Sequence, residues 1–355
     1  MGLPNIDIIF KTQAASAVRR SQKGVVALIV KDAKAPGGHV LTSIADIPAE
    51  LGADNAAYVG RAFLGYVNPP RTVLLYVLKA DAAELTEALD WLATRSFDYL
   101  AGPPDVTAEQ AGAIAAWIKS RRSNDHAVCK AVLPGQAADS EAVVNLTTQD
   151  IKVLGAAFTP AQYCSRVAGL IAGTPMTISC TYAPLSEVED VHRLTRAETD
   201  AAIDAGEFVL FYDGEKVKVG RGVNSLTTVT QDKGEVYRKI KAVEAMDMIQ
   251  SDIRMTLEDS YIGKYANSYD NRCLLITAIQ GYFEGLEQGG ILKAGASTVG
   301  VDMDAQRNYL KSTGVDVDGM TEQQIKEADT GSRVFLAARV WILDAIEDVL
   351  LNIGI

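Results

Sequence analysis

The sequence of 355 residues lacks the residue patterns on which most catalytic and metal sites are built. Its four cysteines contain no CxxC pair, and its three histidines show neither HxxxH spacing nor a cysteine partner. No Gly-x-Ser-x-Gly elbow is present to expose a nucleophilic serine. We therefore predict no catalytic residue, no metal and no cofactor, and we expect the cysteines to be buried free thiols in a reducing compartment. The cysteines are Cys129, Cys164, Cys180 and Cys273.

Basic residues are in the minority, with 34 Lys and Arg against 45 Asp and Glu, and the net charge is −11. Such a surface repels phosphate backbones, so we predict no nucleic-acid partner. No apolar run reaches the roughly 18 residues that a membrane span needs, and residues 1–30 do not follow a signal-peptide pattern. We expect the protein to be made and kept in the cytoplasm unless a larger particle carries it out.

The first 205 residues alternate between apolar strand-like runs and amphipathic helix-like runs. The first of these is an apolar run at residues 6–10, which fits either a terminal arm or a first strand of the local sheet. Strands separated by helices are typical of βαβ units and a mostly parallel sheet, so we predict an α/β region. Strands are predicted at 24–30, 71–78, 97–100, 127–133, 151–157 and 176–182, and helices at 47–64, 82–94, 107–121, 140–145, 160–172 and 197–205.

The second part of the chain has a different pattern, which predicts a helix-rich α+β region. Asp213-Gly214 between two β-like runs predicts a hairpin, and the glycine-flanked run 219–228 predicts another. Apolar residues at three- and four-residue steps predict a long helix from near Gly234 and a second at 271–288. Thr321-Glu-Gln-Gln324 is a capping box that begins a short helix, and 332–353 reads as a β-rich tail. The whole is an α/β and α+β multidomain chain.

Three features come close to ligand sites without completing one. Gly220-Arg-Gly-Val-Asn-Ser225 is one residue from GxGxxG, but β-like sequence follows it, so we interpret it as a tight turn. The run 314–319 resembles a calcium loop, yet Gly314 and Ile325 would occupy the first and last ligand positions, and neither side chain can coordinate. His192 has acidic neighbours, which leaves a metal or base role open, although a surface histidine is the favoured interpretation.

Four tyrosines gather in the sequence around a helix break at Gly263. Aromatic residues near Gly and Asn can stack on a base or sugar, and they are also common at protein interfaces. Because the chain is acidic, we favour an interface. The tyrosines are Tyr261, Tyr265, Tyr269 and Tyr282, and the candidate interface or hinge residues are Tyr261, Gly263, Tyr265 and Tyr269.

Several short motifs in the C-terminal half carry a family resemblance. They are Gly220-Arg-Gly-Val-Asn-Ser-Leu-Thr-Thr228, Lys239-Ile-Lys-Ala-Val-Glu-Ala-Met-Asp247, Tyr261-Ile-Gly-Lys-Tyr265, Asn267-Ser-Tyr-Asp-Asn271, Glu327-Ala-Asp-Thr-Gly-Ser332 and Val334-Phe-Leu336. In combination they resemble the tail sheath proteins of contractile phage tails and phage-like bacteriocins, especially the short prophage-type sheaths of Gram-positive bacteria. The N-terminal half fits this family by length and βαβ order.

The resemblance implies a structural subunit and no enzyme. Such subunits stack as six-membered rings around an inner tube, meet a baseplate and a tail terminator, and contract to drive the tube through a target envelope. It implies assembly in the host bacterial cytoplasm, followed by incorporation into a virion or phage-tail-like particle. It also implies a central domain with a subtilisin-like fold but no protease activity. The implied domains are an N-terminal arm at 1–22, an α/β domain at 23–95, a central sheath domain at 96–230, an assembly domain at 231–338 and a C-terminal arm at 339–355.

Members of the family are joined by terminal arms that add strands to a neighbour's sheet. Free strand edges are a liability in a monomer but suit a polymer joint. By position, the arm residues implied here are Ile6, Ile8, Phe10, Val340, Ile342, Ile346 and Val349.

A soluble α/β enzyme is the alternative interpretation of the same sequence. A hydrolase or a nucleotide-using transferase would place its site at the carboxyl ends of strands, near Gly102-Pro103 and Gly155. This alternative depends on fold analogy, which does not specify function.

Overall fold

The computed structural model describes residues 23–354, which form two compact units. We call residues 23–247 and 344–354 the sheet unit, and residues 248–343 the helical unit. The boundary falls inside helix α6 (Ile240–Ser260), so the chain passes from one unit to the other within a helix. The strand expected at residues 6–10, with Ile6, Ile8 and Phe10, lies outside the described residues.

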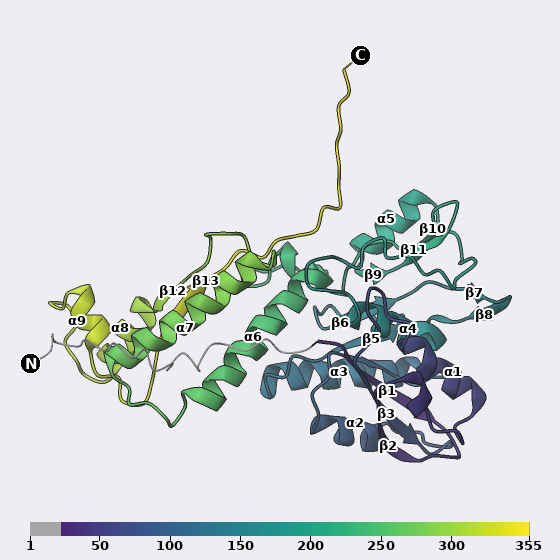
Figure 1. The fold of residues 1–355 in the computed structure, drawn as a ribbon, viewed down its shortest axis with the longest axis horizontal. Coiled ribbons are helices and arrows are strands. Elements are labelled where there is room, and N and C mark those ends of the chain that lie inside the picture. Colours follow the sequence, from purple (N-terminus) through teal and green to yellow (C-terminus); the bar gives the residue numbers. More distant parts are fainter. Residues whose placement is uncertain (1–22, 355) are drawn as a thin grey trace, which may run out of the picture. The chain divides into compact units, whose positions relative to one another are not determined.

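A seven-stranded sheet is the centre of the sheet unit, in the order β2-β3-β1-β4-β5-β6-β9 (Figure 1). Its neighbours pair in parallel, apart from the antiparallel pair of β2 and β3. The strands are β1 (Val25–Lys31), β2 (Gly37–Leu41), β3 (Thr72–Leu78), β4 (Tyr99–Ala101), β5 (Lys130–Pro134), β6 (Val143–Leu146) and β9 (Glu207–Phe208). The parallel α/β arrangement predicted from the strand–helix alternation is confirmed.

Helices cover both faces of this sheet, because its central strands are apolar on both sides. In β1, Leu28 belongs to a core with α1 and α4, whereas the next residue, Ile29, belongs to a second core with α2 and α3. Helices α1 and α4 pack so closely that a Cβ on Gly169 would lie 2.0 Å from the Ala62 carbonyl oxygen. The helices are α1 (Ala53–Ala62), α2 (Thr86–Ala93), α3 (Ala108–Asn124) and α4 (Pro160–Ala172).

Capping boxes fix the start of several helices. Thr107, Thr159 and Thr195 each accept a hydrogen bond from the backbone N–H three residues on, and the Gln or Glu at that third position reaches back. Pro160 begins α4 at a position where a backbone N–H would have no partner within the helix. Proline, which has no N–H, is therefore well suited to this position. The last of the three boxes begins α5 (Arg196–Asp204).

Two hairpins complete the sheet unit. They are β7 (Ile151–Val153) with β8 (Ala156–Phe158), and β10 (Leu210–Tyr212) with β11 (Val217–Val219). The second hairpin turns at Asp213-Gly214, as predicted, and Gly214 has a φ of +105°, which suits glycine.

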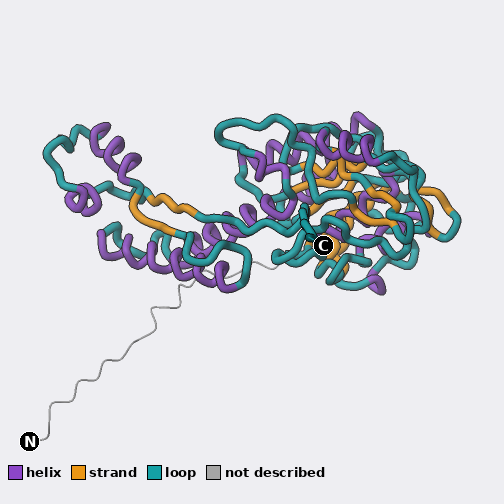
Figure 2. The backbone as a smooth tube through the Cα atoms, turned by 90° about the horizontal axis from the view of Figure 1, so that it is seen from above, coloured by secondary structure: helices purple, strands orange, loops and turns teal. Residues whose placement is uncertain are grey.

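The helical unit is built from α6 beyond residue 247, α7 (Tyr269–Gln288) and a two-stranded antiparallel sheet of β12 (Thr298–Val301) and β13 (Leu336–Arg339). The two long helices are joined by a buried hydrogen bond of 2.7 Å from the Tyr282 hydroxyl to Asp252. Two shorter helices, α8 (Met303–Ser312) and α9 (Glu322–Glu327), close over Leu310 and Ile325. The capping box predicted at Thr321 begins α9. Figure 2 shows the backbone by secondary structure.

Several local predictions are wrong. Residues 140–145 were expected to be helical but lead into β6, because the buried β-branched pair Val143 and Val144 joins the sheet in parallel with β5. Residues 176–182 form turns rather than a strand, and residues 220–228 form a loop rather than a hairpin. The predicted β-rich tail has β13 and a bridge at Ile342, but no strand in 344–354. Sequence reasoning missed β2, β12 and α8.

The seven-stranded sheet contains strands from both sides of the predicted division at residue 95. The implied α/β domain at 23–95 and central domain at 96–230 share the seven-stranded sheet, since β4 pairs directly with β1. The long helix begins at Ile240, because Lys239 is extended (φ −90°, ψ 122°) after a short 3-10 turn (Glu235–Arg238). No helix of the described residues is long and apolar enough to cross a membrane.

Candidate functional site

Helix α6 begins in a buried cluster of charges within the sheet unit. Lys130, on β5, places its Nζ 2.6 Å from the Asp247 carboxylate and 3.2 Å from that of Glu244. Arg122 forms a bidentate ion pair with Asp247, in which its two terminal nitrogens lie 2.8 and 3.0 Å from the carboxylate oxygens. These α6 carboxylates are almost completely buried, so the cluster fixes the start of the helix on the sheet.

Glu244 has two further partners in this cluster. It pairs with Lys23 Nζ at 2.6 Å and accepts a hydrogen bond of 2.5 Å from the Tyr99 hydroxyl. Burial alone would raise the pKa of Glu244, but Lys130 and Lys23 outweigh it and lower that pKa to about 2. The same carboxylates hold the pKa of Lys130 above its ordinary value, although burial opposes them. All of these charges are satisfied within the chain.

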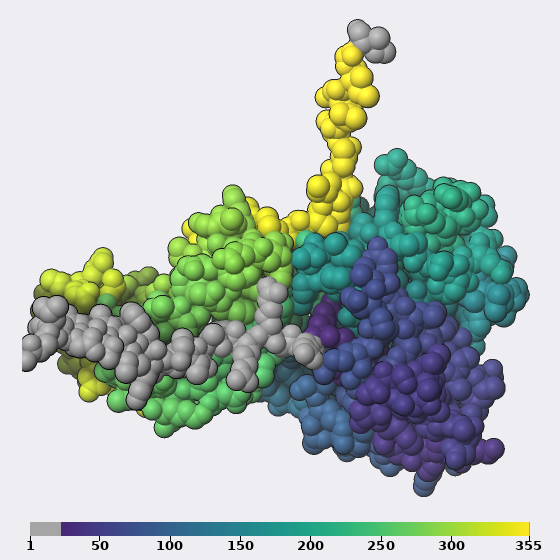
Figure 3. All heavy atoms as spheres, viewed as in Figure 1, coloured from purple at the N-terminus to yellow at the C-terminus, as the bar shows by residue number. Residues whose placement is uncertain are grey.

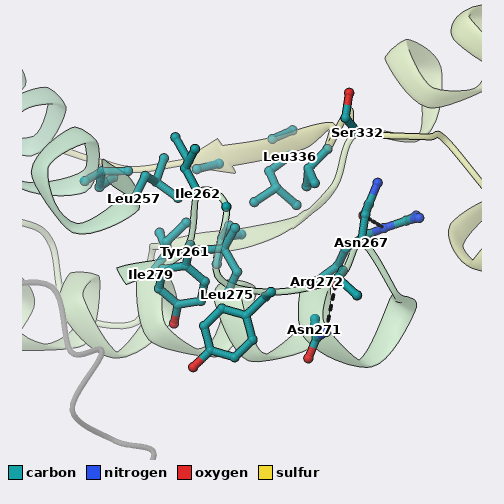
Figure 4. Close-up of a pocket in the computed structure, with 18 of the residues that line it drawn as sticks. Leu257, Tyr261, Ile262, Asn267, Asn271, Arg272, Leu275, Ile279, Ser332 and Leu336 are labelled. Atoms are coloured by element: carbon teal, nitrogen blue, oxygen red, sulfur yellow. Dashed lines mark hydrogen bonds between the residues drawn. The ribbon is translucent and has the colours of Figure 1, made fainter. Parts of the chain in front are cut away.

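The other end of α6 is chemically different. Within the helical unit, α6, α7 and β13 enclose an open groove of about 980 Å³ (Figure 4). The walls are mainly apolar, with Ile253 and Leu257 from α6, Leu275 and Ile279 from α7, and Leu336 from β13. A groove of this size and lining is suited to apolar side chains of another segment.

Three of the four predicted interface residues line this groove. Tyr261 and Tyr265 lie in the connection between α6 and α7, with their ring centroids 5.4 Å apart, and Gly263 lies between them with a φ of +75°. Tyr269, by contrast, is the first residue of α7 and is not among the lining residues. Tyr282, which the sequence grouped with them, is buried in the middle of α7.

One end of the groove is closed by a polar network that joins two of the sequence motifs. The Asn267 amide donates to the carbonyl oxygens of Gly331 at 2.7 Å and Arg333 at 3.0 Å. Arg272 is 3% exposed, and it donates to Asn267 at 2.7 Å and to two carbonyls of the 326–328 turn. The network holds the connection after α6 against the segment that leads into β13.

Strand β13 forms the floor of the groove through Leu336, Ala337 and Ala338. It pairs on one side with β12, and the two strands make a sheet of their own. Among the described residues, therefore, each of these strands has one edge that carries no neighbouring strand.

The predicted C-terminal arm residues fall into two groups. Val340 and Ile342 are half-buried, and Ile342 bridges Leu292 within the helical unit. Ile346 and Val349 are 90% and 78% exposed in a segment without regular secondary structure. Figure 3 shows the C-terminal segment in yellow. Leu350, Leu351 and Ile353 are similarly exposed, so residues 344–354 present a run of apolar side chains to water.

The ligand-like motifs do not form ligand sites in the described residues. No helix begins at Gly220, whose backbone N–H donates to the Val209 carbonyl oxygen. Asp318 pairs with Lys311 in an exposed turn, and His192 lies 3.9 Å from Asp150 on the surface. Within residues 23–354, no group of three or more His, Cys, Asp or Glu side chains could hold a metal ion.

The two positions named for the alternative enzyme do not meet. Gly102 and Pro103 follow β4 and are buried, with the Gly102 carbonyl oxygen accepting a hydrogen bond of 2.7 Å from Tyr58. Gly155 is in the turn of the exposed β7–β8 hairpin, outside the main sheet. Of the cysteines expected to be buried, Cys129, Cys164 and Cys180 are buried, whereas Cys273, on α7, is partly exposed.

Sequence reasoning missed the charge cluster and the Arg272 network. One signal was available for the cluster, since Lys130 interrupts an apolar strand run and a charge at such a position needs a buried partner. The partners themselves lie more than 100 residues away in the sequence, and no periodicity connects them.

Comparison with known proteins gives a consistent result. Sequence profiles match the phage tail sheath protein central domain at residues 79–225 and the phage tail sheath C-terminal domain at 232–355. The chain is 39% identical over 353 residues to the tail sheath protein of Clostridium phage phiCD119, covering 98% of each chain. It is also similar to two Bacillus subtilis proteins, including the phage-like element PBSX protein XkdK, at 29% identity over 179 residues (50% of this chain and 38% of that protein).

Solved structures of similar fold agree. The sheath tail protein from Desulfitobacterium hafniense matches with a TM-score of 0.70 and 19% identity, covering 84% of this chain and 94% of that chain. The helical sheath of the anti-feeding prophage in its contracted state matches with a TM-score of 0.70 and 17% identity, covering 100% and 99%. At these identities the matches show a shared fold.

Proposed function

The chain belongs to the phage tail sheath protein family, and we propose that it polymerises as stacked six-membered rings around an inner tube. It is a structural protein of a contractile tail. In this proposal, contraction of the polymer drives the tube through a target envelope, and the other partners are the tube protein, a baseplate and a tail terminator. Assembly takes place in the host bacterial cytoplasm, before incorporation into a phage or phage-tail-like particle. The central domain has the subtilisin-like fold that the family resemblance implies.

The exposed apolar tail is the observation that supports polymerisation most strongly. Ile346 and Leu350 are 90% and 89% exposed, and three further apolar side chains of the same segment, Val349, Leu351 and Ile353, are 75–78% exposed. Isolated apolar side chains on a surface are ordinary, but a continuous run of them is typical of an interaction segment. Covering each such side chain contributes roughly 1.5–3 kcal/mol. A second copy of the chain is the partner that a homopolymer supplies.

The groove of the helical unit is the proposed acceptor for that tail. Its walls are apolar, and its floor is β13, one edge of which carries no strand in the described residues. An extended segment laid along β13 can add main-chain hydrogen bonds while its alternate side chains enter the groove. We propose that the tail of one copy, and the N-terminal arm with Ile6, Ile8 and Phe10, add to this sheet in a neighbour. Val340 and Ile342, at the start of the arm, then stay with the helical unit of their own subunit.

The proposed contraction depends on the same contact between the tail of one subunit and the groove of its neighbour. A head-to-tail contact that does not close generates a helical polymer, and the contracted anti-feeding prophage sheath of similar fold is helical. Arms that stay bound while the bodies of the subunits move let the polymer change its packing without coming apart. Tyr261, Gly263 and Tyr265 are then interface residues beside the acceptor groove, and Tyr269 follows them at the start of α7. The extended polymer is a metastable packing separated by a barrier from the contracted one.

Negative-stain electron microscopy of the purified full-length chain tests this proposal. We expect striated hollow tubes or rings from the natural sequence. A variant with Leu350→Asp and Leu351→Asp should remain monomeric, because its tail can no longer enter an apolar groove. Deletion of residues 1–21 should have the same effect.

A matched control separates charge from the loss of apolar surface. Asn352→Asp adds a negative charge to the same exposed segment without removing an apolar side chain, so it should leave assembly intact. Absence of any ordered polymer from the natural sequence, at all concentrations and salt conditions, would contradict the proposed function. Tubes from the doubly substituted variant would contradict the role of the tail alone.

A further inference from the structure

The base of the C-terminal tail is bound to the sheet unit, although its backbone continues from the helical unit. Glu347 accepts hydrogen bonds from the Thr181 hydroxyl at 2.5 Å and the Ser179 hydroxyl at 3.3 Å, and Arg221 Nε lies 3.6 Å from its other oxygen. The Glu347 side chain is 9% exposed, in a segment whose neighbouring apolar side chains are almost fully exposed. Among residues 346–354, Glu347 is therefore the one that is not exposed.

The receiving site is also held together by hydrogen bonds of its own. The Thr181 hydroxyl accepts a hydrogen bond from the Gly222 backbone N–H at 3.0 Å, and the Thr181 N–H donates to Ser179 at 3.1 Å. A Cβ at Gly222 would lie 2.8 Å from the Cys180 sulfur and 3.2 Å from the Ser179 hydroxyl oxygen. Glycine is thus required at this position for the two hydroxyls to line up. We call Ser179, Thr181 and Arg221 the tail socket.

Two further ion pairs hold the same stretch of chain. Asp344, the first tail residue of the sheet unit, pairs with Lys239 immediately before α6. Arg221 extends past Glu347 to Asp348 at 2.6 Å, although Asp348 itself is 84% exposed. The Gly-Arg-Gly sequence that resembled a nucleotide loop thus supplies a guanidinium for two carboxylates of the tail.

We propose that the tail socket is a positioning site, which fixes the point and direction at which the C-terminal tail leaves the subunit. This inference rests on the proposed role of the tail in polymerisation. A fixed base limits the conformations that the apolar residues beyond Asp348 must give up when they enter a neighbour. Ser179, Thr181 and Arg221 are positioning residues, and the apolar residues of the tail make the contact with the neighbour.

Chymotrypsin cleavage after Leu350 and Leu351, followed by mass spectrometry on dilute, unpolymerised full-length protein, reports tail mobility directly. A protease needs several flexible residues on both sides of the bond, so a bound Glu347 protects it. Glu347→Ala should increase the cleavage rate about tenfold, as loss of hydrogen bonds to a charged group implies. Asp348→Ala is the matched control, and it should change the rate by less than about twofold because exposed ion pairs contribute little.

The critical concentration for polymerisation is the second measurement. Glu347→Ala should raise it, with an unchanged melting temperature. Thr181→Val should also raise it, whereas Thr181→Ser keeps the hydroxyl and should behave like the natural sequence. Unchanged cleavage and unchanged critical concentration in Glu347→Ala would overturn the proposal. A lowered critical concentration would also overturn it, because the socket would then be withholding the tail. If the natural sequence forms no polymer, the proposed function fails while the cleavage measurement still tests the socket.

Discussion

The two ends of helix α6 are held by opposite kinds of chemistry. At its start, Glu244 and Asp247 are buried and are paired with Lys23, Lys130 and Arg122 of the sheet unit. At its other end, in the helical unit, the apolar side chains of α6 line an open groove. The first region satisfies all of its charges within one chain, and the second leaves apolar surface uncovered. This difference separates the part of the molecule that serves internal stability from the part that is proposed to receive another subunit.

The groove provides the largest expected effect. Leu257→Asp places a charge on the groove wall, so it should abolish polymerisation observed by electron microscopy. Met255→Asp is a matched control, because this residue is on the same helix, is 38% exposed and does not line the groove. Equal loss of polymerisation in both variants would show that any added charge on α6 is harmful, and it would remove the special role of the groove.

The charge cluster should matter for folding in a way that the groove does not. Glu244→Gln removes the carboxylate partner of Lys23 and one of the two carboxylates that pair with the buried Lys130, which should cost about 3–5 kcal/mol of unfolding free energy. Glu258→Gln, at an exposed ion pair of 2.8 Å with Arg254 later in the same helix, should cost less than about 0.5 kcal/mol. Denaturant unfolding of unpolymerised protein measures both. Equal costs for the two substitutions would contradict the distinction between the two ends of α6.

Lowering the pH should reduce the free energy of unfolding gradually, and by less than the Glu244→Gln substitution does. The pKa of Glu244 is lowered from 4.5 to about 2 in the folded protein, so its contribution is complete above pH 4.5 and is lost as the pH falls towards 2. The slope from this one group is at most about 1.4 kcal/mol per pH unit. Asp98 opposes it, because burial and the nearby Glu244 charge raise the pKa of Asp98.

Unfolding free energies measured between pH 5 and pH 2.5 check this prediction. The Glu244→Gln variant should have a flatter acid dependence than the natural sequence, since it lacks the group that titrates. Hydrogen exchange resolved by mass spectrometry should place the acid-sensitive change in the sheet unit. Identical pH profiles for the two proteins would mean that Glu244 is not responsible.

The comparison also explains what the sequence could predict. Apolar periodicity located β1, β3, α3, α4 and α7, because each has a face or a run that must be buried whatever surrounds it. It failed at residues 140–145, where two parallel neighbours stabilise a strand against a weak local preference. The charge cluster and the tail socket depend on contacts between residues more than 100 positions apart, which no local pattern specifies.

The candidate assembly residues differ in how clearly the sequence marks them, because only some belong to a local pattern. Tyr261, Gly263 and Tyr265 were found because a glycine interrupts a strong helical pattern beside aromatic residues, and all three line the groove. The floor of the groove at Leu336 was part of the family resemblance but gave no chemical signal of its own. The tail was read correctly as apolar, but not as a segment without strands in 344–354.

Disulfide trapping between two different chains tests most directly whether the tail of one copy fills the groove of another. One chain carries Val349→Cys and the other Leu336→Cys, both with Cys273→Ser to remove the partly exposed natural thiol. After co-assembly and mild oxidation, we predict a covalent heterodimer, because paired Cα atoms within about 7 Å can form the bond. Tubes that contain no heterodimer, or a doubly substituted chain that forms only an intrachain bond, would contradict the account.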